Sequence, residues 1–161
     1  AEHSVPFLSV RERVTVLFKE FVAQKHYSFH EGFDDWRDAI RAACAPLEAD
    51  GSIEPEYASF IIEKVEELGP YIVIAPDICI PHAERGRGVN RTAMCFMKTE
   101  KPVRFHEDGE HDARIFVVLA AADDEEHIQN LMELSECLSD ETIVAKLLAA
   151  KTPEDLRAIE E

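Results

Sequence analysis

The sequence predicts an α/β (α+β) fold, a three-layer α/β/α sandwich in which helices flank a small mixed central sheet of four to five strands. Apolar residues recur at helical spacing at both ends of the chain, whereas the middle holds short β-branched apolar runs. A sheet in the middle with helices on its faces is the simplest packing for this order. The length of 161 residues, with 46% hydrophobic and 31% charged residues, fits one globular domain.

Helical periodicity and capping signals predict three helices before the strand-rich region. Asp34 and Asp35 offer an N-cap to the second helix, and acidic residues around Pro55 suit the first turn of the third. Gly69 and Pro70 then end the third helix. The elements expected here are a helix over 7–24, an edge strand over 26–30, a helix from Trp36 that ends before Asp50, and a helix over 54–68.

Four short apolar runs rich in β-branched residues predict buried strands in the middle of the chain. These runs are residues 71–75, 78–80, 92–97 and 114–120, with polar loops over 83–91 and 99–113. After Ala122 the helical pattern returns, and residue types that cap helices open three further segments. The capping positions are Asp123-Asp124, Asp140 and Thr152.

The formal net charge of −16 makes two classes of partner unfavourable. Such a chain repels nucleic acids and anionic membrane surfaces, and it attracts a protein partner with a basic rim. The alternative explanation is that the acidic residues only keep the protein soluble. No apolar run reaches the ~20 residues of a membrane-spanning helix. Residues 1–6 lack the pattern of a signal peptide, and four widely spaced cysteines indicate reduced, buried thiols. We therefore expect a cytoplasmic protein.

His82 follows Pro81 at the end of the apolar run over 78–80. Proline cannot donate to a sheet ladder, so the strand ends there and holds the next side chain on a rigid support. Neutral imidazole is a nucleophile near pH 7, and one ring nitrogen can attack phosphorus while the other donates a fixing hydrogen bond. A loop histidine without a chemical role would have the same local sequence, and a motif this short does not separate the two.

A second histidine, His127, lies in the first turn of a predicted helix. Its spacing to the leucines at positions 131, 134 and 138 places it on the apolar stripe of that helix. Backbone N–H groups at a helix N-terminus can help hold an anion. The alternative is a partly buried core histidine bonded to a carbonyl. The four acids before His127 oppose an anion unless they point to solvent and cap the helix.

Four stretches in a fixed order resemble the mannitol/fructose-type enzyme IIA family (EIIA type 2) of the bacterial sugar phosphotransferase system (PTS). The four stretches are residues 53–57, 78–82, 101–105 and 127–128, the last with the leucine-rich helix that follows it. In order and spacing, the resemblance extends from about residue 30 to the end of the sequence. The segment 68–76 resembles the ascorbate-type branch of this family. Residues 26–161 are therefore identified as the EIIA domain, and residues 1–25 as an N-terminal helical extension.

The resemblance implies a phosphocarrier in which two histidines have different roles. The phosphorylated histidine of the family falls on His82, which would accept a phosphoryl group from the carrier HPr and pass it to a cysteine of an EIIB partner. That step feeds sugar uptake through a membrane EIIC protein. The family's second histidine falls on His127, which would support the phosphoryl group. Phosphoryl transfer of this kind needs positioning and charge stabilisation, so no cofactor and no metal are expected, and pairing as a homodimer is left open.

Two positions depart from the pattern of the family. Mannitol-type members carry an arginine on the helix before the site, where this chain has Lys64, a point charge without the bidentate fork of a guanidinium. Relatives have glycine where this chain has Asp77, and a carboxylate near the site could weaken phosphate binding or reshape the turn. We therefore expect Lys64 to bind the phosphoryl group as a partial substitute for arginine.

Three other interpretations fit parts of the sequence. The domain could be a stand-alone module that reports its phosphorylation state to a regulator or transporter. Cys79-x-x-His82 has the spacing of metal ligands, to which His106, His111 and His127 could add nitrogens, although a closed zinc site needs a second ligand pair. A Cys79 nucleophile would need a lowered thiol pKa, and only His82 lies near enough in sequence to lower it. We expect the histidines other than His82 and His127 to be solvated.

Overall fold

The computed structural model describes residues 9–84, 86–106 and 109–159. The strands are β1 (Tyr27–His30), β2 (Val73–Ala75), β3 (Asp77–Cys79), β4 (Ala93–Arg104) and β5 (Asp112–Ala120). They form one sheet in the order β1-β4-β5-β3-β2. β1 is parallel to β4 and β3 is parallel to β5, whereas the β4–β5 and β2–β3 pairs are antiparallel. The small mixed central sheet predicted from the sequence is confirmed.

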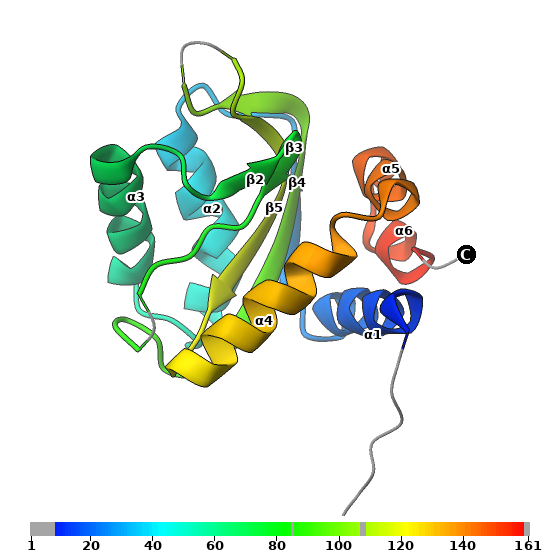
Figure 1. The fold of residues 1–161 in the computed structure, drawn as a ribbon, viewed down its shortest axis with the longest axis horizontal. Coiled ribbons are helices and arrows are strands. Elements are labelled where there is room, and N and C mark those ends of the chain that lie inside the picture. Colours follow the sequence, from blue (N-terminus) through cyan, green and yellow to red (C-terminus); the bar gives the residue numbers. More distant parts are fainter. Residues whose placement is uncertain (1–8, 85, 107–108, 160–161) are drawn as a thin grey trace, which may run out of the picture.

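Helices cover both faces of this sheet (Figure 1). α2 (Trp36–Ala49) and α3 (Glu56–Leu68) lie on one face. The other face is covered by α1 (Val10–Ala23), α4 (Asp124–Cys137), α5 (Glu141–Ala149) and α6 (Pro153–Arg157). The predicted three-layer α/β/α sandwich is therefore confirmed. The predicted first helix began at residue 7, but residues 7 and 8 lie outside the described residues, as does the segment 1–6.

Short polar side chains cap the helices where the sequence predicts caps. Each of these side chains accepts a hydrogen bond from a backbone N–H in the first helical turn, and they belong to Asp35, Asp123, Asp140 and Thr152. Gly69 ends α3 with a φ of 88°, a left-handed conformation that glycine adopts at little cost. α3 begins at Glu56 rather than Glu54, because Pro55 occupies the N-cap position.

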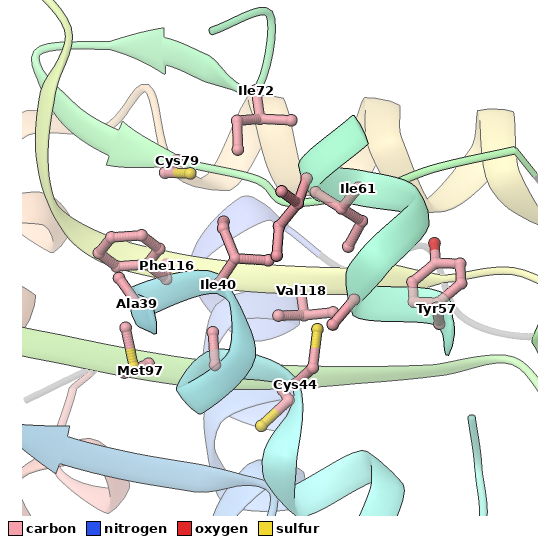
Figure 2. Packing of buried hydrophobic residues seen from close by; sticks show 14 of the residues in the cluster. Ala39, Ile40, Cys44, Tyr57, Ile61, Ile72, Cys79, Met97, Phe116 and Val118 are labelled. Atoms are coloured by element: carbon pink, nitrogen blue, oxygen red, sulfur yellow. The ribbon is translucent and has the colours of Figure 1, made fainter. Parts of the chain in front are cut away.

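β5 is buried on both faces because its apolar side chains alternate between two cores. The odd-numbered residues of 115–119 enter the core beneath α1, α4, α5 and α6. Phe116 and Val118 enter the core beneath α2 and α3. Figure 2 shows these two side chains in one cluster with Ile40 of α2 and Ile61 of α3. β5, the central strand of the sheet, is therefore embedded between the two cores.

The predicted loop over 99–113 is wrong at both ends. β4 continues to Arg104, and β5 already begins at Asp112. The extension was not predicted because its residues are largely polar, which is typical of a loop. In the structure, however, Lys98 is only 1% exposed, and its Nζ lies 2.6 Å from Oε2 of Glu100. A paired charge of this kind is tolerated inside a sheet, although residue type alone would assign it to solvent.

Burial differs from the prediction in two other places. Residues 71–75 were expected to form a buried strand, but β2 lies at the edge of the sheet and Ile74 is 41% exposed. His26 was expected to be solvated, but it is 5% exposed and its Nε2 lies 2.5 Å from Oδ2 of Asp50. All four cysteines are buried and free, as expected. Within the ranges the structure describes, no helix is both long and apolar enough to cross a bilayer.

Candidate functional site

His82 lies just beyond the end of β3, beside the last residues of β5. The backbone N–H of Leu119 donates to the carbonyl of Pro81 at 2.9 Å, and the N–H of Ile80 donates to the carbonyl of Ile72 at 2.8 Å. Proline has no N–H for a further ladder bond, so strand pairing stops there. The backbone just before the half-buried His82 is therefore hydrogen-bonded to β5 on one side and to Ile72, the residue before β2, on the other.

The Nδ1 of His82 is held by a hydrogen bond, whereas Nε2 makes no hydrogen bond to the described residues. The Nδ1 atom lies 2.7 Å from the carbonyl oxygen of Ile80. A carbonyl oxygen can only accept a hydrogen bond, so Nδ1 carries the hydrogen of the neutral ring. The lone pair then resides on Nε2, which is the nucleophilic atom of this side chain.

Two tyrosine hydroxyls hold the peptide bond that follows His82. The hydroxyl of Tyr71 donates to the carbonyl oxygen of His82, and the two rings meet edge to face with centroids 5.2 Å apart. The backbone N–H of Ala83 donates to the hydroxyl oxygen of Tyr57 at 3.0 Å. Tyr57 in turn donates to the carbonyl of Leu119 on β5 at 2.8 Å. The two hydroxyls therefore clamp this peptide unit, which we call the tyrosine clamp, and they fix the backbone that carries the imidazole.

α4 brings His127 next to His82, with ring centroids 5.4 Å apart. The Nδ1 of His127 is buried and has no hydrogen-bond partner among the described residues. The four acids that precede it are exposed, and Asp123 accepts the N–H of Glu126 at 2.8 Å as the cap of α4. The sequence allowed an anion site here only if these acids faced solvent and capped the helix. All four are exposed, and Asp123 is the one whose side chain caps α4.

The surroundings of His82 lower the pKa of its imidazole below the ordinary value. Burial is the main cause, because it disfavours the charged ring. The hydrogen bond to Ile80 opposes this effect, whereas the nearby charges of His127 and Lys64 add to it. The ring is therefore neutral, and its Nε2 lone pair available, at neutral pH.

Lys64 lies on α3 in a pocket of about 180 Å³ that adjoins His82 through Ala83. Its Nζ is 3.8 Å from Oε1 of Glu84, in the loop after His82. Arg87 lines the same pocket from that loop. Two cationic side chains therefore stand beside the site, whereas the sequence pointed only to Lys64.

Asp77 lies at the far end of β3 from His82. Its φ of 69° is in the left-handed region, which aspartate tolerates better than most residues and glycine tolerates best. Asp77 pairs with Ala113 at the start of β5, whereas Pro81 bonds to Leu119 near its end. Of the two effects considered for this position, the placement of Asp77 between β2 and β3 favours a change in the shape of that turn.

The metal and thiol interpretations find no matching arrangement. Within 9–84, 86–106 and 109–159, no group of three or more His, Cys, Asp or Glu side chains could hold a metal ion. Cys79 is fully buried in the core beneath α2 and α3, and this burial raises the pKa of its thiol well above the ordinary value. Its neighbours Ile78 and Ile80 enter the opposite core, as their alternation in the sequence predicted.

The structure places His127 next to His82, and it places Lys64 in the pocket that Ala83 and Glu84 line just after His82. Sequence reasoning did not assign a role to Tyr57 or to Tyr71. A signal for the first existed, because a tyrosine on the buried stripe of a helix needs a partner for its hydroxyl. No sequence signal would have assigned the other members of the pocket, since their positions depend on how the loop after His82 folds.

The fold and the site define a class of protein: a small mixed α/β domain with one histidine just beyond a strand end and a second histidine beside it. One solved structure of this fold is the mannitol-specific cryptic phosphotransferase enzyme IIA CmtB from Escherichia coli. It has a TM-score of 0.78 and 28% identity, with 89% of this chain and 97% of that chain covered. Another is the complex of mannitol enzyme IIA and phosphorylated enzyme IIB from E. coli. The matching chain of this complex has a TM-score of 0.73 and 25% identity, with 84% of this chain and 94% of that chain covered.

Sequence similarity narrows this class to one family. The ascorbate-specific PTS system EIIA component of Shigella dysenteriae serotype 1 is 31% identical over 124 residues, which are 76% of this chain and 80% of the relative. Residues 20–161 match the family described as phosphoenolpyruvate-dependent sugar phosphotransferase system, EIIA 2. The chain belongs to this family.

Proposed function

We propose that the chain is a cytoplasmic phosphocarrier that accepts a phosphoryl group from phospho-HPr on His82 and passes it to a cysteine of an EIIB partner. The observation that carries this proposal is the imidazole of His82, whose Nδ1 is bonded to Ile80 while Nε2 stays free beside His127. Family membership supplies the class of reaction. The relative seen in complex with a phosphorylated enzyme IIB supports EIIB as the acceptor.

In the first transfer, the Nε2 lone pair of His82 attacks the phosphorus of the donor's phosphohistidine, in line with the bond that breaks. A P–N bond forms to His82, the P–N bond of the donor breaks, and its electron pair returns to the donor's imidazole. The His82 ring takes on positive charge as the new bond forms. The carbonyl of Ile80 stabilises that charge through the Nδ1–H.

His127 and Lys64 would offset the negative charge of the phosphoryl oxygens. The buried Nδ1 of His127 lacks a partner in the described part of the chain, and a phosphoryl oxygen would supply one. Lys64 is close enough to affect the pKa of His82, and its flexible stem allows the ammonium to approach the phosphoryl group. These two side chains would stabilise the group electrostatically without bonding to phosphorus.

In the second transfer, a thiolate sulfur of EIIB attacks the same phosphorus atom. A P–S bond forms, the P–N bond to His82 breaks, and the electron pair returns to Nε2. The tyrosine clamp keeps the imidazole in one position for both transfers, which favours in-line geometry. The curated relatives are ascorbate-specific, so we propose L-ascorbate, taken up through an EIIC protein, as the sugar that this transfer serves.

Labelling tests this function directly. Incubation with phosphoenolpyruvate, enzyme I and HPr should attach an acid-labile, base-stable phosphate to the chain, and His82→Ala should abolish it. A chase with the EIIB protein of an ascorbate system should remove the label, whereas mannitol EIIB should remove it more slowly. Full labelling of the His82→Ala variant would contradict the assignment of the phosphorylated residue.

A further inference from the structure

The pocket beside His82 holds an ion pair that is poorly suited to a purely structural role. The Lys64 Nζ and Glu84 Oε1 atoms are 3.8 Å apart, and the two side chains are 33% and 63% exposed. Ion pairs this long and this exposed contribute little to stability. The Lys64–Glu84 pair can therefore open and re-form at little cost in free energy.

The Lys64 ammonium is also close enough to His82 to lower the pKa of the imidazole. The same ammonium would attract a dianionic phosphoryl group on Nε2. Glu84 is two residues beyond His82, so its carboxylate and that phosphoryl group would compete for one cation. A phosphoryl group carries more charge than a carboxylate, and it would therefore displace Glu84 from Lys64.

Arg87 offers a second partner for the displaced carboxylate. Its guanidinium carbon lies 3.9 Å from the centroid of the Phe60 ring, a stacked position that holds the side chain in place. Arg87 forms no ion pair among the described residues, although Glu63, Glu67 and Glu84 line the same pocket. Stacking uses the face of the guanidinium and leaves its N–H edge available to a carboxylate.

Resting on the proposed function, we propose that Glu84 is a positioning residue that occupies Lys64 in place of the phosphoryl group and moves to Arg87 when His82 is phosphorylated. In the unphosphorylated protein, Glu84 pairs with the Lys64 ammonium. In the phosphorylated protein, Lys64 contacts the phosphoryl oxygens and Glu84 pairs with Arg87. The cost of displacing Glu84 weakens the hold on the phosphoryl group, which favours release to the next carrier.

The test compares Glu84→Gln with Glu67→Gln, which removes the same charge from the same pocket without breaking the ion pair. The small-molecule donor phosphoramidate labels histidine without a partner protein, so docking does not enter the result. Glu84→Gln should raise the labelling rate of His82 and the half-life of the phosphohistidine by about two- to five-fold, the range expected for an exposed ion pair. Glu67→Gln should change the labelling rate and the half-life by less. In a chain that already carries Lys64→Gln, adding Glu84→Gln should change neither quantity.

A spectroscopic signal separates this role from a general effect of charge. The Arg87 Nε–H resonance should shift when the wild-type chain is phosphorylated, and that shift should be lost in Glu84→Gln. Equal labelling rates in Glu84→Gln and Glu67→Gln, or a retained Arg87 shift, would overturn the inference while leaving His82 as the phosphorylated residue. Absence of His82 labelling in every variant would overturn the proposed function and this inference together.

Discussion

The two halves of the site are built in opposite ways. On one side, the tyrosine clamp and the carbonyl of Ile80 hold His82 through hydrogen bonds to backbone groups of the sheet. On the other side, Lys64 and Glu84 make one long ion pair at the surface. The first half fixes the position of the His82 imidazole. The second half contains charged side chains whose ion pair can break and re-form easily.

This difference matches what phosphoryl transfer requires. Under the proposed function, the attacking nitrogen of His82 must stay in line with the bond that breaks, and positional freedom there would slow both transfers. The charge around the phosphoryl group must bind it and then release it, so a tight cation site would trap the intermediate. We therefore expect variants of the tyrosine clamp to lower the stability of the fold and to shift the His82 imidazole. Variants of Lys64, Glu84 and His127 should leave the fold intact and change only the rates of phosphoryl transfer, with smaller effects in free energy.

The largest effect is expected from Tyr57→Phe. This change leaves the N–H of Ala83 and the carbonyl of Leu119 without their buried partner, and should lower the free energy of unfolding by about 2–3 kcal/mol. Urea denaturation would measure this loss. Tyr27→Phe is a matched control, because the Tyr27 hydroxyl makes no hydrogen bond to the described residues. Equal loss in both variants would show that Tyr57 has no special connection to the site.

A smaller effect is expected from His127→Ala. The chain should still be labelled on His82, because the attacking Nε2 atom is unchanged. Onward transfer to EIIB should slow about tenfold, or ~1.4 kcal/mol, the size expected for one hydrogen bond to a charged group. Rapid-quench measurements of transfer would detect this change. Removal of the exposed His106 provides a control that should transfer at the normal rate. Normal onward transfer by His127→Ala would remove this residue from the mechanism.

The smallest effect concerns the pH dependence of His82. Burial lowers the pKa of the folded imidazole below its ordinary value near 6.5, so labelling should fall only below that pH. Between the two pKa values the unfolded chain binds more protons, so the free energy of unfolding should decrease as the pH falls through this window. An NMR titration of the His82 ring would locate the midpoint, and Lys64→Gln should raise it. A midpoint at or above 6.5 would contradict burial as the main influence.

Local signals in the sequence were enough to predict the helices and the strand end that carries His82. The caps at Asp35 and Asp123 act through backbone groups within three residues, so short-range chemistry identifies them. The extension of β4 was missed because it depends on the burial of Lys98 against Glu100, which residue type alone does not suggest. Burial decided by distant neighbours is the part of the fold that periodicity cannot supply.

The site, like the fold, has residues that the sequence could predict and contacts that depend on tertiary packing. Pro81 and the strand before it marked His82 as a candidate, but the family resemblance was needed to distinguish it from a loop histidine without a chemical role and to pair it with His127. The tyrosine clamp joins α3, the β2 region and the end of β5, so it exists only after tertiary packing. The pairing of Lys64 with Glu84 likewise depends on how the loop after His82 packs against α3.

The most direct test of the account is which nitrogen of His82 carries the phosphoryl group. Because Nδ1 donates to Ile80, the phosphorus should bond to Nε2. The chain can be labelled with ¹⁵N-histidine and phosphorylated by phosphoenolpyruvate, enzyme I and HPr, and the ¹⁵N–³¹P coupling can then be measured by NMR. A single coupling to Nε2 of His82 is predicted, whereas a coupling to Nδ1, or to a nitrogen of His127, would contradict the account.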